Sequence, residues 1–558
     1  MKVVLILLCS SILTGLVLCD DDLSVCCKNG CVLGTVLPGH RRQYQAFLGI
    51  PYAKPPVGEL RFKNPVPASK WFPEKYNGTY SRATCIQKIY ASHSTFAYGD
   101  EDCLYMNIYR PILKTRNKLL PVIVLITGGG FTIGTGSNVD FSPDYLMNRD
   151  DIMLIVLQHR LGVFGYLCSG DSSCPGNFGL KDQQMALEWI RDNVDKFGGN
   201  PASVTLLGQG SGCAAVQMHM MNARSSLLFH RVILQSGSLA HWALLKNPKK
   251  QFQLQAKYVD IEGYKTLPSQ DLVDKLRKVD AVILRESADK FKFWHFDHLV
   301  NYRPCVEDDW EDAFLTENPY WAWDNGTYTP KPMLITFTPV DGTYRTPILT
   351  NETLLDEFNE QMRSILPQFL EFPSKDLDVV LKFYFKGKRP VIDEKNEKIF
   401  LKMVTDRYFH QAIYNTVTQF RSQVNTKKFP IYLYKFNFVS EFRYTKRITA
   451  TDRFFGVGYR DDLLFMFRIP SVFPDIEFDS VEERMSDIYG GVLVHFAVHG
   501  KEKQWLSHQK CSRKVNEFCQ YQEFQKYSDD TTNEVIVSVS DRFRVNAAKF
   551  WNLVDQGE

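Results

Sequence analysis

One short stretch limits what this chain can fold into. Residues 204–207 are apolar apart from Thr205, which is typical of a buried strand. Residues 208–212 then contain three glycines, and the small residues Cys213, Ala214 and Ala215 follow. Glycine permits the positive backbone angles of sharp turns, whereas alanine favours helix. The stretch therefore predicts a buried strand that turns abruptly into a helix.

The spacing of these glycines is similar to the motif G-x-S-x-G, the nucleophile elbow. In that motif a serine stands at the apex of the strand-to-helix turn, with its side chain exposed above the sheet. Here Gly208 and Gly212 match the flanking glycines, but the central residue is Gly210, and the hydroxyl of Ser211 comes one position later. The turn aims only its central side chain at a substrate, so we expect Ser211 to be turned away. The sequence predicts an elbow without its nucleophile.

Several stretches resemble the type-B carboxylesterase and cholinesterase family. Residues 47–62 resemble its F-x-G-I-P-Y-A-x-P-P-V-G-x-L-R-F, residues 101–108 its E-D-C-L-Y-L-N strand, and residues 175–183 its P-G-N-x-G-L-x-D-Q. The elbow resembles its G-E-S-A-G or G-Q-S-A-G. The resemblance implies an α/β-hydrolase fold, a large and mostly parallel sheet flanked by helices, as a single domain over residues 30–558. No linker, low-complexity tract or repeat in the sequence divides that span.

The resemblance also locates the three positions of a serine, acid and histidine triad. Gly210 stands at the serine, Asp341 at the acid, and Tyr459 at the histidine. Aspartate can still orient an imidazole. A phenol, whose ordinary pKa is about 10, is a poor general base near neutral pH. We therefore expect no catalytic residues, only degenerate triad positions.

A glycine loop at residues 128–130 follows the apolar strand at residues 121–127 and resembles the family's H-G-G-G-F. In active members this loop binds the oxyanion, which implies the backbone N–H groups of Gly129, Gly130 and Ser211 as donors. The alternative, a loop kept only for close backbone packing, is equally compatible with the residues.

Three other side chains could be mistaken for catalytic groups. Ser236 lies in a Q-S-G-S stretch, where the resemblance implies a buried structural hydroxyl. His219 and His241 are candidates for a displaced base only by elimination, and a core or surface role is the plainer interpretation.

The first residues predict secretion. Met1-Lys2 precedes the apolar residues 3–18, which is typical of a signal peptide over residues 1–19, and no other long uncharged segment predicts a membrane span. Three N-x-S/T sequons are therefore candidate glycosylation sites, at Asn77, Asn325 and Asn351.

Disulfides are the default state of cysteines in an oxidising compartment. Thirteen cysteines are present, and eleven remain without Cys9 and Cys19 of the signal. The resemblance pairs Cys85 with Cys103, a bridge worth about 3 kcal/mol. Proximity suggests Cys168 with Cys174 and Cys511 with Cys519. The partners of Cys26, Cys27 and Cys31 stay open, and Cys213 is the first candidate for a free thiol.

The resemblance further implies two structural ion pairs, Arg61 with Glu101 and Arg160 with Asp182. The net charge of +3 over 558 residues, without a basic block, predicts no nucleic-acid partner. No cofactor and no metal ion are expected.

Two functions are compatible with these residues. The first is a secreted pseudoenzyme that binds a protein partner or an apolar, ester- or lipid-like ligand, similar to the non-catalytic glutactin and neuroligin group. The alternative is a carboxylic ester hydrolase that uses residues other than the family's triad. The family often forms homodimers, which by analogy is an expectation here.

Overall fold

The computed structural model describes residues 23–89, 96–112, 118–501, 521–528 and 533–557. The predicted signal peptide and the suggested Cys511–Cys519 pair lie outside these residues. The strands are β1 (Ser24–Cys27), β2 (Gly30–Leu33), β3 (Thr35–Leu37), β4 (Tyr44–Pro51), β5 (Lys75–Asn77), β6 (Tyr105–Pro111), β7 (Leu120–Ile126), β8 (Met153–Leu157), β9 (Gly199–Gln209), β10 (Arg231–Gln235), β11 (Met333–Phe337), β12 (Ile431–Asn437), β13 (Tyr521–Ser528) and β14 (Asn533–Ser540).

α-Helices lie in the connections between consecutive strands from β8 to β13. The α-helices are α1 (Gly162–Tyr166), α2 (Phe178–Asn193), α3 (Ser211–Met221), α4 (Pro248–Tyr258), α5 (Ser269–Arg277), α6 (Ala281–Ser287), α7 (Pro319–Asn325), α8 (Thr346–Thr350), α9 (Glu352–Glu360), α10 (Met362–Phe369), α11 (Leu377–Phe385), α12 (Glu397–Thr405), α13 (Gln411–Gln423), α14 (Tyr444–Thr449), α15 (Val481–His499) and α16 (Val545–Gln556). The shorter 3₁₀ and π turns are η2 (Gly58–Leu60), η3 (Leu146–Asn148), η4 (Val194–Phe197), η5 (Ser225–Leu228), η6 (Ala288–Phe291), η7 (Asp341–Arg345), η8 (Ser374–Asp376), η9 (Asp406–His410) and η10 (Asp461–Phe465).

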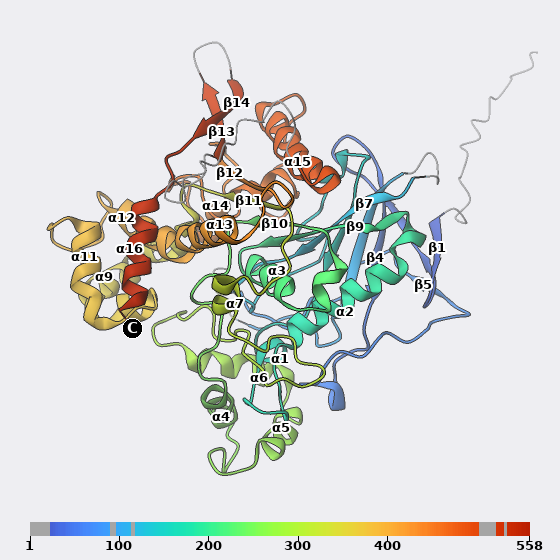
Figure 1. Ribbon diagram of the computed structural model, residues 1–558, viewed down its shortest axis with the longest axis horizontal. Coiled ribbons are helices and arrows are strands. Elements are labelled where there is room, and N and C mark those ends of the chain that lie inside the picture. The colour runs from blue at the N-terminus through green and yellow to red at the C-terminus, as the bar shows by residue number, and fades with distance from the viewer. Residues whose placement is uncertain (1–22, 90–95, 113–117, 502–520, 529–532, 558) are drawn as a thin grey trace, which may run out of the picture.

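An eleven-stranded sheet forms the centre of the molecule, in the order β14-β13-β12-β11-β10-β9-β7-β8-β6-β4-β3 (Figure 1). All neighbours from β8 to β13 are parallel. The strands at both edges are antiparallel. A second, three-stranded sheet joins β1, β2 and β5. The expected large and mostly parallel sheet is confirmed.

The central strands are apolar almost throughout because both faces of the sheet are covered. In β7, Val122, Val124 and Ile126 belong to a core shared with α2 and α3. Ile123 and Leu125 point into a second core, which contains residues of α15. Helices therefore lie on both sides of the sheet, α2 and α3 on one face and α15 on the other (Figure 1).

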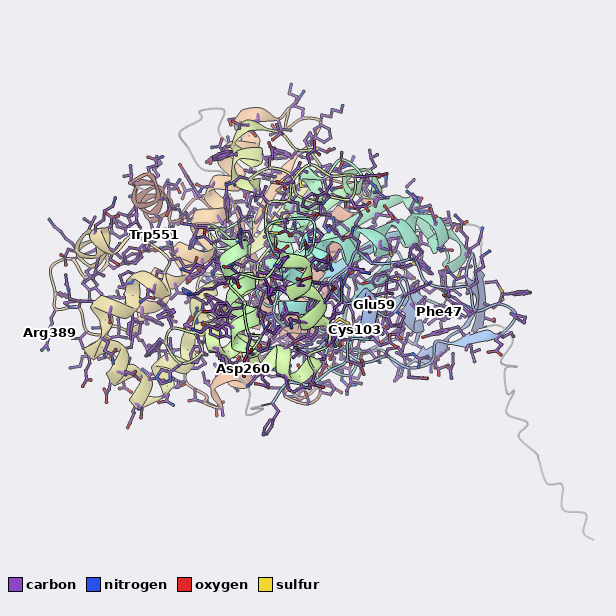
Figure 2. All side chains as sticks on the ribbon, turned by 90° about the horizontal axis from the view of Figure 1, so that it is seen from below. Phe47, Glu59, Cys103, Asp260, Arg389 and Trp551 are labelled. Carbon is purple, nitrogen blue, oxygen red and sulfur yellow. A yellow bond between two sulfur atoms is a disulfide. The ribbon has the colours of Figure 1, made fainter. Side chains whose placement is uncertain are left out.

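The two ends of the molecule are formed by different parts of the chain. Phe47 and Cys103 lie toward one end, and Trp551 and Arg389 toward the other (Figure 2). At the second end α16 packs against α11 through Trp551, whose ring is 6.2 Å from that of Tyr384. No helix among the described ranges is long and apolar enough to cross a membrane.

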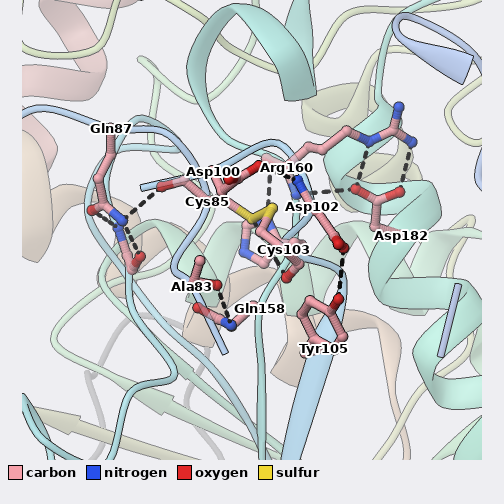
Figure 3. Close-up of a disulfide and its surroundings, with 12 residues drawn as sticks. Ala83, Cys85, Gln87, Asp100, Asp102, Cys103, Tyr105, Gln158, Arg160 and Asp182 are labelled. Atoms are coloured by element: carbon pink, nitrogen blue, oxygen red, sulfur yellow. Dashed lines mark hydrogen bonds and ion pairs between the residues drawn. A yellow bond between two sulfur atoms is a disulfide. The ribbon is translucent and has the colours of Figure 1, made fainter. Parts of the chain in front are cut away.

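The structure contains both ion pairs that the resemblance implied. Arg160 Nη2 lies 2.6 Å from Asp182 Oδ1, and both side chains are buried. Arg61 Nε donates to Glu101 Oε1 at 2.7 Å. The bridge between Cys85 and Cys103 is also present, close to Arg160 and Asp182 (Figure 3). Arg61–Glu101 and the disulfide therefore join N-terminal loops to one another, and Arg160–Asp182 joins the residues after β8 to α2.

The remaining cysteines differ in part from expectation. Cys26 is bonded to Cys31, across a tight hairpin, and Cys213 is a buried free thiol as predicted. The suggested Cys168–Cys174 bridge is wrong: the structure does not join these residues, and their sulfurs point to different carbonyl groups. Cys174 Sγ donates to Leu167 O at 3.3 Å, whereas Cys168 Sγ donates to Pro175 O at 3.4 Å.

Candidate functional site

The predicted strand, turn and helix are β9, Gly210 and α3. Gly210 has φ 55° and ψ −116°, a conformation that residues with a side chain rarely adopt. The flanking glycines permit the close crossing of strand and helix. A Cβ on Gly208 would lie 2.5 Å from the carbonyl carbon of Gly212, and one on Gly212 would lie 2.3 Å from Ile126 O. The elbow is complete in its backbone.

A tyrosine fills the space above the elbow. A Cβ on Gly210 would lie 2.1 Å from the hydroxyl oxygen of Tyr459. The backbone N–H of Tyr459 donates to Thr343 Oγ1 at 2.9 Å, and its ring packs 5.8 Å from Tyr344 and 5.4 Å from Phe409. Burial raises the pKa of Tyr459 to about 12. The group at the histidine position is therefore a neutral phenol directed at Gly210.

Asp341 begins η7 and is fully buried. Its carboxylate accepts bonds from the hydroxyl of Thr338 at 2.7 Å and from the Thr338 N–H at 3.2 Å. Burial raises the pKa of Asp341, while His410 and the hydroxyls of Thr338 and Ser236 oppose that shift. Ser236 is fully buried beside it, which agrees with the structural role that the resemblance implied for that residue.

Ser211 turns toward the glycine loop. Its Oγ accepts a bond from Gly129 N at 3.2 Å and from Phe131 N at 3.3 Å, and the residue is 4% exposed. The hydroxyl thus lies among backbone N–H groups of the loop that was predicted to bind an oxyanion. One of the predicted donors, Gly129 N–H, already has a partner within the chain.

The two histidines considered as displaced bases have other surroundings. His219 is bonded to Ser225 at 2.5 Å and to Gln183 at 2.9 Å, and burial lowers its pKa to about 3. His241 packs 5.4 Å from the ring of Tyr408, and burial lowers its pKa well below the usual value. Neither forms a hydrogen bond with Ser211 in the described part of the chain. His219 therefore has the structural role that was the plainer interpretation.

A cavity of about 180 Å³ opens directly above the elbow. Its floor is the glycine loop together with Gly210 and Ser211, and its wall is rich in aromatic rings. The wall residues with rings are Trp242, Tyr344, Tyr408, Phe409, Tyr444 and Tyr459. The cavity has the apolar character of a site for a small, largely apolar molecule.

One end of this cavity is polar. Arg345, at the end of η7, lies 2.6 Å from the buried Asp297 and stacks on the ring of Phe369. Its Nε is buried and has no hydrogen-bond partner among the described residues. Burial disfavours the charge of Glu371, but the adjacent Arg303 lowers its pKa to about 2. His298 lines the same end, and burial lowers its pKa to about 4.

Sequence reasoning missed this polar end. Its residues come from regions where the family's motifs are loose or absent. The one available signal was Arg345, a charged residue four positions after the predicted acid Asp341 and therefore on the same side of the sheet.

A second cavity, of about 370 Å³, lies behind the glycine loop. Arg460 stands between the two cavities and lines both. Its guanidinium donates to Gln209 Oε1 at 3.2 Å, to the hydroxyl of Tyr444 at 2.8 Å and to Gly128 O at 3.0 Å. Arg460 thus ties the loop that carries Tyr459 to both the elbow and the glycine loop.

The parallel sheet, the elbow at the end of β9 and the glycine loop after β7 define an α/β hydrolase. Residues 21–551 match the Carboxylesterase family, and the chain belongs to that family. It is 36% identical to "Juvenile hormone esterase" of Tribolium castaneum over 85% of this chain and 83% of that protein. It is 32% identical to "Venom carboxylesterase-6" of Apis mellifera over 76% of each.

The fold is also that of a solved structure. The crystal structure of juvenile hormone esterase from Manduca sexta, with OTFP covalently attached, superposes with a TM-score of 0.79 at 24% identity. The match covers 96% of this chain and 99% of that one. The match supports the architecture throughout the described chain.

Proposed function

We propose that this chain is a secreted binding member of the carboxylesterase family that holds an apolar, ester- or lipid-like molecule in its cavity without hydrolysing it. One observation carries the proposal: the hydroxyl of Tyr459 occupies the space above Gly210 that a nucleophile's side chain would need. Gly210 itself supplies no side chain that could attack an ester.

Each chemical step of ester hydrolysis lacks a suitable group at its usual place. The phenol of Tyr459, with a pKa of about 12, is protonated near neutral pH and cannot take a proton from an alcohol efficiently. The hydroxyl of Ser211 uses the Gly129 and Phe131 N–H groups. Stabilising an oxyanion there would require that hydroxyl to move away.

The cavity and the relatives together suggest a ligand class. The aromatic wall of the cavity favours an apolar body, and His298, Arg345 and Glu371 give the cavity one polar end. Asp297 already neutralises Arg345, so we expect a neutral ester or carbonyl group to be preferred over a carboxylate. The name of the Tribolium relative makes juvenile hormone the first ester to test.

Intrinsic fluorescence tests this binding, because Trp242 lines the cavity. Juvenile hormone and, separately, methyl palmitate would be titrated into the purified protein. We expect saturable quenching that is at least tenfold weaker in Val300→Trp, since Val300 lies at the cavity wall. The matched control is Val139→Trp, at a position that is 71% exposed. Equal binding by both variants, or no binding of either ester by the wild type, would contradict the proposal.

The second candidate function is ester hydrolysis by residues other than the family's triad. The names of the relatives favour it, since they are esterases. Ser211 would be its nucleophile, because it is the hydroxyl residue of the elbow and lines the cavity. A serine-directed phosphorylating reagent tests this directly. A stoichiometric adduct on Ser211 would support hydrolysis, and an unmodified protein would contradict hydrolysis through Ser211.

Secretion is part of the proposal. The Cys85–Cys103 and Cys26–Cys31 bridges support an oxidising compartment. The three sequon residues Asn77, Asn325 and Asn351 are exposed, as glycosylation requires. Expression in insect cells should yield protein in the medium that loses mass on treatment with a peptide N-glycosidase, and its absence from the medium would contradict secretion. The same preparation tests the expected homodimer by light scattering.

A further inference from the structure

We propose that Cys168 and Cys305 form a disulfide in the mature protein, and that this bond anchors one wall of the cavity. The structure describes both residues as thiols, far apart in sequence and buried side by side. The inference rests on the proposed secretion, which supplies the oxidising compartment, but not on the proposed binding of a ligand.

The two sulfurs meet at one carbonyl oxygen. Cys168 Sγ donates to Pro175 O at 3.4 Å, and Cys305 Sγ donates to the same oxygen at 3.5 Å. The next residue, Gly176, touches both sulfurs: a Cβ there would lie 2.8 Å from Cys305 Sγ and 3.2 Å from Cys168 Sγ. The two thiols therefore share one small space, with glycine at 176 leaving room for them.

The backbone that carries Cys305 is already fixed opposite Cys168. Cys305 N–H donates to Asn177 Oδ1 at 3.0 Å, and Asn177 Nδ2 donates to Cys305 O at 2.8 Å. Asn177 also donates to Glu307 at 2.7 Å. These bonds hold the loop that contains Cys305 against the start of α2. Formation of the disulfide therefore requires mainly rotation of the Cys168 and Cys305 side chains.

Cys174 is the competing partner, and its contacts disfavour it. Its Sγ points to Leu167 O at 3.3 Å, away from the oxygen that Cys168 and Cys305 share. A bond between Cys168 and Cys174 would require the Cys174 sulfur to turn away from Leu167 O, whereas the Cys305 sulfur already lies at the oxygen that Cys168 contacts. Metal binding by the three thiols is also disfavoured, because no described group of His, Cys, Asp and Glu side chains is arranged to hold a metal ion.

The reaction is an exchange with a small disulfide such as oxidised glutathione. The thiolate of one cysteine attacks that disulfide and releases one glutathione thiol, and the second cysteine then displaces the other. Two protein thiols are thus oxidised to one S–S bond while one glutathione disulfide is reduced to two thiols. A hydrogen bond between Cys305 and Cys168, together with burial, raises the pKa of Cys305. Because thiolate is the reactive form, the bond should form during folding, before the loops close over it.

The bond would act on the cavity through its position in the chain. Cys305 follows His298, Leu299 and Val300, which line the cavity above the elbow. A link to Cys168, which comes shortly after α1, would fix this loop to the parallel part of the fold. The cavity wall would then be held covalently at a point where the Cys85–Cys103 bridge does not reach.

Peptide mapping tests the proposal on the full-length secreted protein. The protein would be unfolded in guanidinium with iodoacetamide and without reductant, then digested and analysed by mass spectrometry. We expect a cross-linked pair of peptides that contain Cys168 and Cys305, with Cys213 alkylated as an internal control for a free thiol. Full alkylation of Cys168 and Cys305, or a cross-link that contains Cys174 instead, would overturn the proposal.

Two variants complete the test. Cys174→Ser should retain the Cys168–Cys305 cross-link. Cys305→Ser should lose it, leave Cys168 alkylated, and unfold at a temperature several degrees lower than Cys174→Ser. Loss of the cross-link in Cys174→Ser would contradict the pairing even if Cys305→Ser failed to fold.

Discussion

At the scale of the residue, the site is defined by the fit of Tyr459 to Gly210. A side chain at the apex would meet the phenol, and glycine also reaches the positive φ of the turn without strain. The two residues are therefore mutually dependent, since glycine makes the room that the phenol fills.

Gly210→Ala should destabilise the fold. The strained backbone costs about 1–3 kcal/mol for a residue with a side chain, and the Cβ would also lie 2.1 Å from the Tyr459 hydroxyl oxygen. Adding Tyr459→Phe removes that oxygen and leaves the next contact at 3.2 Å, so the double variant should regain part of the loss. Urea unfolding measures both. Equal destabilisation in the single and double variants would show that the phenol does not fill the apex.

Asp462 should make stability depend on pH in a defined direction. It is fully buried, accepts bonds from Tyr489 at 2.7 Å and from Gln235 at 2.6 Å, and burial raises its pKa to about 6. A folded pKa above the unfolded value means that the folded chain holds the proton more tightly. The contribution of Asp462 is therefore present below about pH 4 and is lost as the pH rises through about 6.

Asp462→Asn tests this contribution. Between pH 4 and pH 7, the wild type should lose about 2–3 kcal/mol of its free energy of unfolding relative to Asp462→Asn. Urea unfolding at several pH values measures it, with Asp378→Asn, at an exposed carboxylate, as the control. Wild-type and Asp462→Asn curves that run parallel over this range would contradict the raised pKa.

At the scale of the element, the backbone of the elbow and the buried strands could be predicted from the sequence. The glycines at 208, 210 and 212 predicted the elbow because each meets a backbone approach or a positive φ that excludes other residues. The apolar runs predicted the buried strands. The orientation of the Ser211 hydroxyl could not be predicted from the sequence, because it depends on the N–H groups of Gly129 and Phe131 in a distant loop.

Side-chain direction also explains which features the sequence analysis predicted wrongly or missed. Cys168 and Cys174 are near in sequence, but spacing does not reveal where each sulfur points. The polar end of the cavity joins Arg345 to Asp297 and Arg303 to Glu371, from elements that carry no shared motif. Such contacts arise only when the chain is folded.

The ion pair between Arg160 and Asp182 should be essential to the packing of α2 against the sheet. Arg160→Met would leave the fully buried Asp182 without its partner, at a cost of about 3–5 kcal/mol. Asp182→Asn added to it should recover part of this loss. Lys196→Met, at an exposed pair, is the control and should change stability by about 0.5 kcal/mol or less. Thermal unfolding measures the loss of stability in each variant. Equal losses for Arg160→Met and Lys196→Met would contradict a structural role for the buried pair.

At the scale of the whole molecule, the chain has the α/β-hydrolase architecture of its family, and the proposed function is that the site no longer hydrolyses esters. The sheet, the elbow and the glycine loop enclose a cavity, and Tyr459 and Ser211 occupy its reactive positions. The proposed role follows from this combination, since a preserved cavity can bind a molecule that its lining no longer attacks.

Ester turnover tests that claim most directly. Hydrolysis of a p-nitrophenyl ester would be measured for the wild type, Gly210→Ser/Tyr459→His, and the same pair with Ser211→Ala. We predict a silent wild type and activity that is highest in the triple variant, because Ser211→Ala frees the Gly129 and Phe131 N–H groups. Turnover by the wild type well above a heat-inactivated control would contradict the account and place the nucleophile elsewhere in the chain.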